Sequence, residues 1–256
     1  MQLTATSFAV SAVLGVAWLG GRGRLIELRQ PPLAWLHGVG GLFGFHALYF
    51  ASLAHAPPAT ANLINYTWPL LLVLLSVAML RMRLTWQHLL GTALALLGCA
   101  VLLSGRAAFP AGAMVGYALA AASAVVWALY SVLARRFAQV PSGAVVGFCG
   151  VTAMLAAALH GMTGTWVVPS LLAWVAMVAM GIGPVGIAFA LWDAGMKRGD
   201  PRLLGTLAFA TPVLSTLLLT AAGLAPFTAV TVLASVLVTV GGYVAAQGTR
   251  TKVLID

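Results

Sequence analysis

The sequence predicts an all-α integral membrane protein, a polytopic helical bundle, from its composition, its long apolar runs and its charge distribution. Of its 256 residues, 62% are hydrophobic and only 7% are charged, too few to cover a core with a water-exposed polar surface. The apolar runs have about the length, roughly 20 residues, that a helix needs to cross a bilayer. They are too long and too uniformly apolar for the alternating strands of a membrane barrel.

Clusters of basic residues and Gly/Pro turns divide the chain into nine such runs. The expected spans are residues 3–20, 33–54, 59–80, 86–104, 113–135, 143–161, 170–196, 203–222 and 228–247. The first run has no basic residues before it and no convincing cleavage site, and arginines follow it. It is therefore interpreted as a span and not as a secretory signal.

The basic residues fall almost entirely on one side of the expected membrane when the loops are counted alternately. Twelve of the 13 lysines and arginines lie on that side, and Arg106 alone lies on the other. The twelve are Arg22, Arg24, Arg29, Arg81, Arg83, Arg135, Arg136, Lys197, Arg198, Arg202, Arg250 and Lys252. Positive charge marks the cytoplasmic side, so the C-terminus is expected in the cytoplasm. The same split explains the net charge of +9 without a nucleic-acid partner.

Acidic, metal-binding and catalytic patterns are scarce. Only Asp193 among the four acidic residues lies inside an expected span. Lys197, four residues later, is expected to form an ion pair with it. Glu27, Asp200 and Asp256 are assigned to loops or the tail. The chain has no HExxH motif, no acidic pair and no His/Cys cluster with ligand spacing, so we expect no enzyme, no metal and no cofactor.

The chain matches itself at one constant offset, the offset that places Pro69 on Pro212. The same offset places Tyr49 on Trp192, Pro58 on Pro201, Thr85 on Thr228, and Gly98 on Gly241. The last four runs then repeat the first four, while 113–135 has no partner, since its counterpart would precede Met1. Because five is an odd number of helices, two consecutive copies have inverted topology, a transporter architecture. The expected domains are an N-terminal repeat, 1–106, with its first helix apparently missing, and a C-terminal repeat, 107–256.

The stretch ALYFASLAHAPPATANLINYTWPLLLVLLS, residues 47–76, carries a family resemblance. It looks most like the bacterial aromatic amino acid exporters, and the longer run 40–103 that contains it resembles the EamA-type 5+5 helix carriers of the drug/metabolite transporter superfamily. The resemblance implies an inner-membrane exporter with ten helices and both termini in the cytoplasm. It covers essentially the whole chain and is less specific about the substrate.

A polar stripe within the run 59–80 is the first candidate for a substrate cavity. Asn62, Asn65, Tyr66 and Pro69 follow one another at helical spacing, so they share one face of a helix, and Trp68 lies beside them. A proline cannot donate a hydrogen bond to the carbonyl four residues earlier, so the helix should bend and leave a carbonyl free at mid-membrane. The alternative is that the polar groups join neighbouring helices and the proline only shapes the bundle.

The second repeat offers the matching interruption in the stretch LAFATPVLS. There Pro212 corresponds to Pro69, and Phe209 is a candidate site residue. Paired interruptions of this kind are the best sequence indication of a transporter's binding site. Gly183 and Pro184 are candidate hinges together with the two prolines, because such positions bend easily.

Aromatic residues and one histidine complete the candidate site. His46 and Tyr49 share a helix face, and His46 either carries a proton or contacts a carboxylate, or is a neutral ring bonded to a neighbouring helix. The remaining candidates are Trp127, Tyr130, Phe189 and Trp192. A cavity of rings and amides without fixed charge suits a small neutral solute such as an amino acid.

The expected function is therefore export of small neutral metabolites, most of all aromatic and other neutral amino acids, by alternating access. The alternatives are an exporter of another neutral metabolite or drug on the same fold, and a membrane channel, which would prefer a continuous polar filter. The expected partners are the solute and the lipid bilayer, and the chain is expected to act as a monomer.

Overall fold

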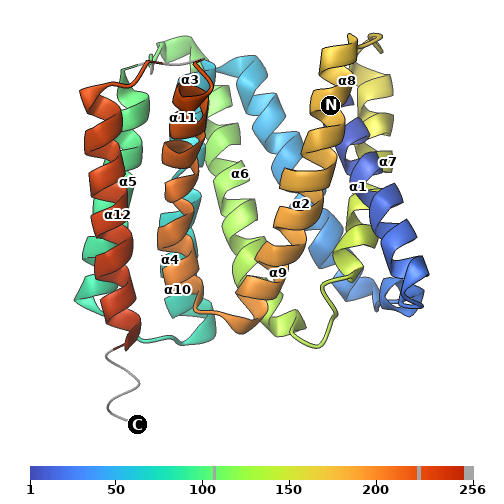
Figure 1. Ribbon diagram of the computed structural model, residues 1–256, viewed down its shortest axis with the longest axis horizontal. Helices are drawn as coiled ribbons and strands as arrows, with labels where there is room; N and C mark the ends of the chain where they lie inside the picture. Colours follow the sequence, from blue (N-terminus) through green and yellow to red (C-terminus); the bar gives the residue numbers. More distant parts are fainter. Residues whose placement is uncertain (106–107, 224–225, 251–256) are drawn as a thin grey trace. The chain divides into compact units, whose positions relative to one another are not determined.

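The computed structural model describes residues 1–105, 108–223 and 226–250, and all regular structure in these ranges is helical (Figure 1). The α-helices are α1 (Gln2–Gly21), α2 (Pro32–His55), α3 (Pro58–Asn65), α4 (Trp68–Leu80), α5 (Trp86–Ser104), α6 (Met114–Leu133), α7 (Ala144–Thr163), α8 (Leu171–Met180), α9 (Ala188–Arg198), α10 (Pro201–Ala208), α11 (Ala210–Ala221) and α12 (Ala229–Arg250). Shorter helical turns are η1 (Leu25–Leu28), η2 (Ala111–Ala113), η3 (Ala134–Phe137) and the π-helix η4 (Gly181–Ile187). Three of the charged residues, Arg106, Lys252 and Asp256, lie outside the described residues.

Eight helical stretches of the described chain are long and apolar enough to cross a membrane. They are Gln2–Gly21, Pro58–Leu80, Trp86–Leu103, Ala111–Phe137, Ala144–Thr163, Leu171–Arg198, Pro201–Ala221 and Ala229–Gly248. The ninth expected span, 33–54, corresponds to α2, which is 24 residues long but is not among the eight, because His37, His46, His55 and several glycines lower its hydropathy. The chain is a multi-pass membrane protein.

The chain forms two compact units, and each combines segments from both halves of the sequence. Unit 1 contains residues 1–50 and 133–198, and unit 2 contains residues 51–132 together with the described chain from Gly199 onward. The units are therefore different sets of helices from the repeats 1–106 and 107–256, which remain a prediction.

In unit 1, α1 packs against α7 in antiparallel orientation. A side chain at Gly15 would meet Val146, and one at Gly150 would meet Ala12, so the chain numbers rise along one helix as they fall along the other. α1 also contacts η4, where Gly181 lies against the backbone carbonyl of Ser7. Small residues thus allow close backbone approach, as is common between membrane helices.

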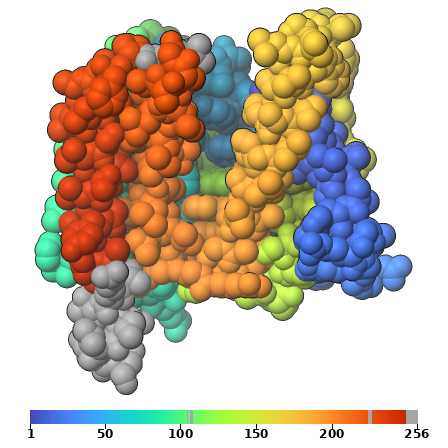
Figure 2. Space-filling model, viewed as in Figure 1, coloured from blue at the N-terminus to red at the C-terminus, as the bar shows by residue number. Residues whose placement is uncertain are grey.

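In unit 2, α5 and α12 pack against each other as an antiparallel pair, with α12 in front of α5 in Figure 1. A Cβ added to Gly98 would lie 2.9 Å from the carbonyl oxygen of Ala234, and one added to Gly241 would lie 2.5 Å from that of Gly91. The sequence offset that places Gly98 on Gly241 also places Gly91 on Ala234, so these two contacts are equivalent. α11 packs beside α12, and side chains fill the space between them in the space-filling view (Figure 2).

Two of the expected spans are each broken into two helices. α3 ends at Asn65 and α4 begins at Trp68, while α10 ends at Ala208 and α11 begins at Ala210. Pro69 cannot donate a hydrogen bond to the carbonyl of Asn65, four residues earlier, because proline has no N–H. Pro212 stands in the same relation to Ala208. Both prolines then occupy the first turn of the following helix, where a missing N–H has no cost.

The expected span 170–196 is interrupted as well. The seven residues of η4, with Pro184 inside, separate α8 from α9. A proline removes one donor from the helical ladder, and a single widened π-turn is one way in which a helix accommodates it. Gly183 and Pro184 lie within this turn, and their role as hinges remains a prediction.

Candidate substrate site

The polar and aromatic candidates of unit 2 gather beside the break between α3 and α4. Asn65 is buried and donates from Nδ2 to the Ser123 hydroxyl of α6 at 2.7 Å. Trp68, at the start of α4, meets Trp127 edge to face, with ring centroids 6.2 Å apart, and Trp127 contacts Tyr130 at 5.3 Å. α6 and the start of α4 thus bring three large rings close together.

The amide of Asn65 is held in one orientation. Ser123 donates its own proton to the backbone carbonyl of Ala120 at 2.7 Å, so its oxygen is left to accept from Asn65. The amide oxygen of Asn65 is therefore the acceptor end of the side chain. Asn62, one turn earlier on α3, is half-buried.

Phe209 and Tyr66 lie on the apolar side of unit 2. Phe209 is fully buried in a cluster with Ala95, Cys99, Val213, Ala234 and Val238, and Tyr66 packs against this cluster. The sequence offset places Tyr66 on Phe209, and each lies at the break of its own helix. A role for either ring in substrate binding remains a prediction.

The candidates of unit 1 form a second cluster of rings, centred on His46. The His46 ring contacts Phe8 of α1 at 4.9 Å and Phe189 of α9 at 6.0 Å, and Phe8 and Phe189 are 5.9 Å apart. Phe45 stacks on Tyr49 at 5.8 Å on the same helix. Three elements therefore contribute to one aromatic surface.

His46 has a hydrogen-bond partner within its own helix. Its Nδ1 lies 2.7 Å from the Leu42 carbonyl oxygen, which identifies Nδ1 as a nitrogen that carries a proton. Trp192, also on α9, is half-buried. His46, Tyr49, Phe189 and Trp192 thus belong to unit 1, and the other predicted substrate-binding residues belong to unit 2.

Sequence reasoning missed several residues of these clusters. Phe8 lies far from His46 in the sequence, and spacing along one helix cannot reveal a partner on another. Ser123 gave a weak signal, since a serine within an apolar run at mid-membrane needs a partner. Asp200 and Arg202 were assigned to a loop, although an Asp-Pro pair before a helix is a typical start signal.

One fixed charge lies next to a candidate ring, because Asp193 directly follows Trp192 in α9. The predicted pair of Asp193 and Lys197 is confirmed, with 2.6 Å between Lys197 Nζ and a carboxylate oxygen, and both side chains are buried. Lys197 also donates to the Val140 carbonyl at 2.8 Å. Among the described residues there is no group of three or more His, Cys, Asp or Glu side chains that could hold a metal ion.

Comparison with known proteins identifies the class. The EamA-like transporter family matches residues 1–104 and 114–246, and the chain belongs to this family. The family resemblance in the sequence is therefore confirmed, and the chain is a member of a transporter family and not of an enzyme family.

Individual relatives agree with the family. The chain is 49% identical to the aromatic amino acid exporter YddG of Ancylobacter novellus, over 95% of this chain and 86% of that protein. It is 27% identical to a probable terminal-alkyne amino-acid exporter of Streptantibioticus cattleyicolor, over 77% of this chain and 65% of that protein. A solved crystal structure with 49% identity matches with a TM-score of 0.93, over 97% of this chain and 88% of the other.

Proposed function

We propose that this chain exports aromatic and other neutral amino acids. The observation that carries the proposal is the group of rings and one oriented amide in unit 2, formed by Asn65, Trp68, Trp127 and Tyr130 without a fixed charge among them. Aromatic rings favour an aromatic side chain in offset or edge-to-face geometry. The amide oxygen of Asn65 and a backbone carbonyl at the helix break can accept from the ammonium group of a zwitterion, and the second amide N–H of Asn65 can donate to its carboxylate. The relative with 49% identity is named an aromatic amino acid exporter.

The mechanism we propose is alternating access between two inverted repeats. Two observations support it: the helix breaks at Tyr66 and Phe209, which the sequence offset relates, and the equivalent contacts of Gly98 and Gly241 in the antiparallel pair of α5 and α12. Equivalent contacts in both directions are what a two-fold axis perpendicular to the two helices produces. Inverted repeats of this kind place a transporter's site near the bilayer midplane.

The location we propose is the bacterial inner membrane, with the C-terminus in the cytoplasm. The basic residues of the described chain support this orientation. Arg22 and Arg24 follow α1, Arg135 and Arg136 lie in η3, and Arg83 lies between α4 and α5. These connections would all face the cytoplasm under the positive-inside rule. We further propose that one copy of the chain is the transporting unit.

Counterflow of labelled phenylalanine in proteoliposomes tests the proposed substrate. Vesicles loaded with unlabelled phenylalanine should take up label in a saturable manner, and external threonine should compete while an unrelated sugar should not. If the sugar blocks uptake and the amino acids do not, the substrate of this chain is another class of solute. Protein-free vesicles are the control.

A further inference from the structure

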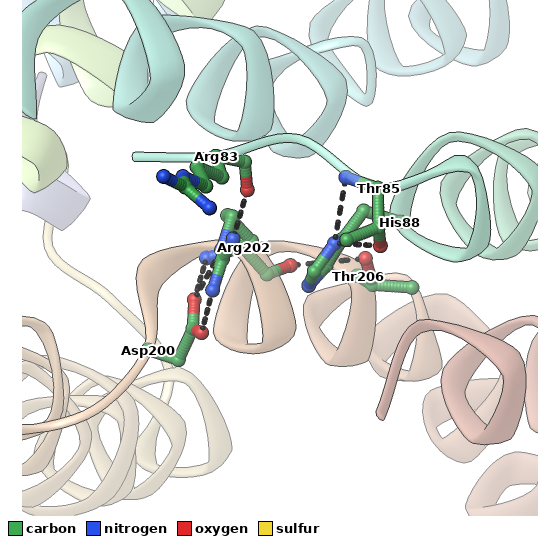
Figure 3. Close-up of polar contacts among 6 residues, drawn as sticks. All are labelled: Arg83, Thr85, His88, Asp200, Arg202 and Thr206. Carbon is green, nitrogen blue, oxygen red and sulfur yellow. Dashed lines mark hydrogen bonds and ion pairs between the residues drawn. The ribbon is translucent and has the colours of Figure 1, made fainter. Parts of the chain in front are cut away.

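Asp200 and Arg202 form a buried ion pair at the start of α10 in unit 2 (Figure 3). The Arg202 side chain is 4% exposed and that of Asp200 is 15% exposed. The guanidinium donates to both carboxylate oxygens, from Nε at 3.0 Å and from Nη2 at 2.6 Å. Asp200 also accepts the backbone N–H of Arg202 at 2.9 Å, so the same carboxylate caps the helix.

The pair connects α10 to two other parts of unit 2. Arg202 Nη1 donates to the backbone carbonyl of Arg83 in the connection between α4 and α5. The carbonyl of Arg202 accepts from the Thr206 hydroxyl at 3.0 Å, and that hydroxyl lies 2.9 Å from the Thr92 hydroxyl of α5. Arg202, Thr206 and Thr92 are all buried. α10 is therefore fixed to the α4–α5 connection through Arg202 and to α5 through Thr206.

The next turn of α10 reaches the candidate substrate site. A Cβ added to Gly205 would lie 3.1 Å from the carbonyl oxygen of Pro69 and 3.0 Å from Leu72 Cδ2, so α10 rests directly on the first turn of α4. Pro69 follows Trp68, the ring that contacts Trp127. Arg202 fixes the position of α10, and α10 in turn supports the start of α4.

The electrostatics keep this anchor charged. Burial raises the pKa of the Asp200 carboxyl, but the hydrogen bonds and positive charge of Arg202 outweigh burial, and the pKa lies below its ordinary value. The carboxylate is therefore ionised at neutral pH and retains its partner. An arginine fork is also geometrically more demanding than a lysine, because it needs two carboxylate oxygens in one plane.

We propose that Arg202 is a positioning residue for the substrate site of unit 2. It fixes α10 so that Gly205 supports the Pro69 turn, and through that turn it sets the position of Trp68 beside Trp127. This inference rests on the proposed function where it is tested by transport of phenylalanine. It rests on the structure alone where it is tested by amide hydrogen exchange. A residue that only stabilises the fold would change how much active protein is present, but not the affinity of that protein for substrate.

The test compares four variants by two measurements. Arg202→Met removes the anchor, Arg202→Lys retains the charge without the fork, and Gly205→Ala disturbs the Pro69 contact while leaving the ion pair intact. Arg198→Gln is the matched control, because it removes an exposed positive charge four residues before Arg202. The measurements are KM and Vmax for phenylalanine counterflow, and amide hydrogen exchange resolved by segment.

We expect Arg202→Met and Gly205→Ala to raise KM about tenfold and to speed amide exchange in residues 66–72 about tenfold. Arg202→Lys should fall between them and the wild type, and Arg198→Gln should match the wild type. Faster exchange confined to residues 83–88 and 199–206 with an unchanged KM would overturn the inference. If Arg202→Met does not fold, Gly205→Ala decides. If the wild type itself shows no phenylalanine counterflow, the proposed function fails. The rate of amide hydrogen exchange in residues 66–72 of the variants then still decides whether Arg202 positions the start of α4.

Discussion

Gly98 of α5 and Gly241 of α12 occupy positions that the sequence offset relates, and they make equivalent contacts with each other's helix. Gly98 faces Ala234 and Val238, and Gly241 faces their counterparts Gly91 and Ala95. Such reciprocity needs backbones that approach closely, which only small residues permit. The interface of α5 and α12 should therefore be sensitive to one added methyl group.

Gly241→Ala tests this sensitivity. The new Cβ would lie 2.5 Å from the carbonyl oxygen of Gly91 and 2.8 Å from the Ala95 nitrogen, which are backbone atoms and cannot rotate away. We expect a loss of about 1–3 kcal/mol in stability, the usual cost of overpacking, seen as a lower thermal unfolding midpoint in detergent. Gly40→Ala is the control, since nothing lies within 4 Å of its Cβ position. Equal midpoints for both variants would contradict this packing.

The aromatic wall of unit 2 is tested by the double variant Tyr66→Ala with Trp68→Ala. Loss of both rings removes the contact with Trp127 and one ring beside the helix break. We expect phenylalanine counterflow to fall by about tenfold or more, with expression and monodispersity unchanged. Counterflow at the wild-type rate would remove these residues from the site.

His46 is expected to act as a ring and not as a proton carrier. Its Nδ1 is bonded to the Leu42 carbonyl, and Phe8 and Phe189 pack against its ring. His46→Phe should then retain counterflow, while His46→Ala should lose it. The pH profile of His46→Phe should match that of the wild type between pH 5 and pH 8, roughly the range in which histidine titrates. If counterflow depends on pH in the wild type but not in His46→Phe, His46 carries a proton during transport.

Asp200 gives the fold a defined response to acid. Its pKa is lowered in the folded chain, because the bonds and charge of Arg202 outweigh its burial. The stabilisation is thus complete above the carboxyl pKa of the unfolded chain, and it is lost as the pH falls through the lower folded pKa. Asp200→Asn should cost roughly 3 kcal/mol at pH 7, near the lower end for a broken buried pair. The unfolding midpoints of variant and wild type should converge in acid, and a constant gap would contradict the shift.

The helical breaks follow from covalent chemistry and could be predicted from the sequence. Pro69 and Pro212 lack the N–H that the carbonyls of Asn65 and Ala208 require, and α3 and α10 end at those two residues. The ion pair of Asp193 and Lys197 could also be predicted, because side chains four residues apart lie on the same face of a helix.

Contacts between distant segments could not be predicted in this way. Arg202 has the sequence context of a cytoplasmic loop charge, and only the packing of α10 against α4 and α5 buries it. Phe8 likewise joins His46 through the packing of helices that one-dimensional spacing does not describe. The grouping of helices into two units depends on the same long-range contacts.

The most direct test of the central claim is phenylalanine release from bacterial cells. Cells lacking their own exporters are loaded with a phenylalanyl peptide, which they hydrolyse, and external phenylalanine is measured over time. Cells that produce this chain should release phenylalanine several times faster than cells that produce the Tyr66→Ala, Trp68→Ala double variant at the same membrane level. Equal release from the two strains would contradict the proposal that this chain exports aromatic amino acids through the site beside the helix break.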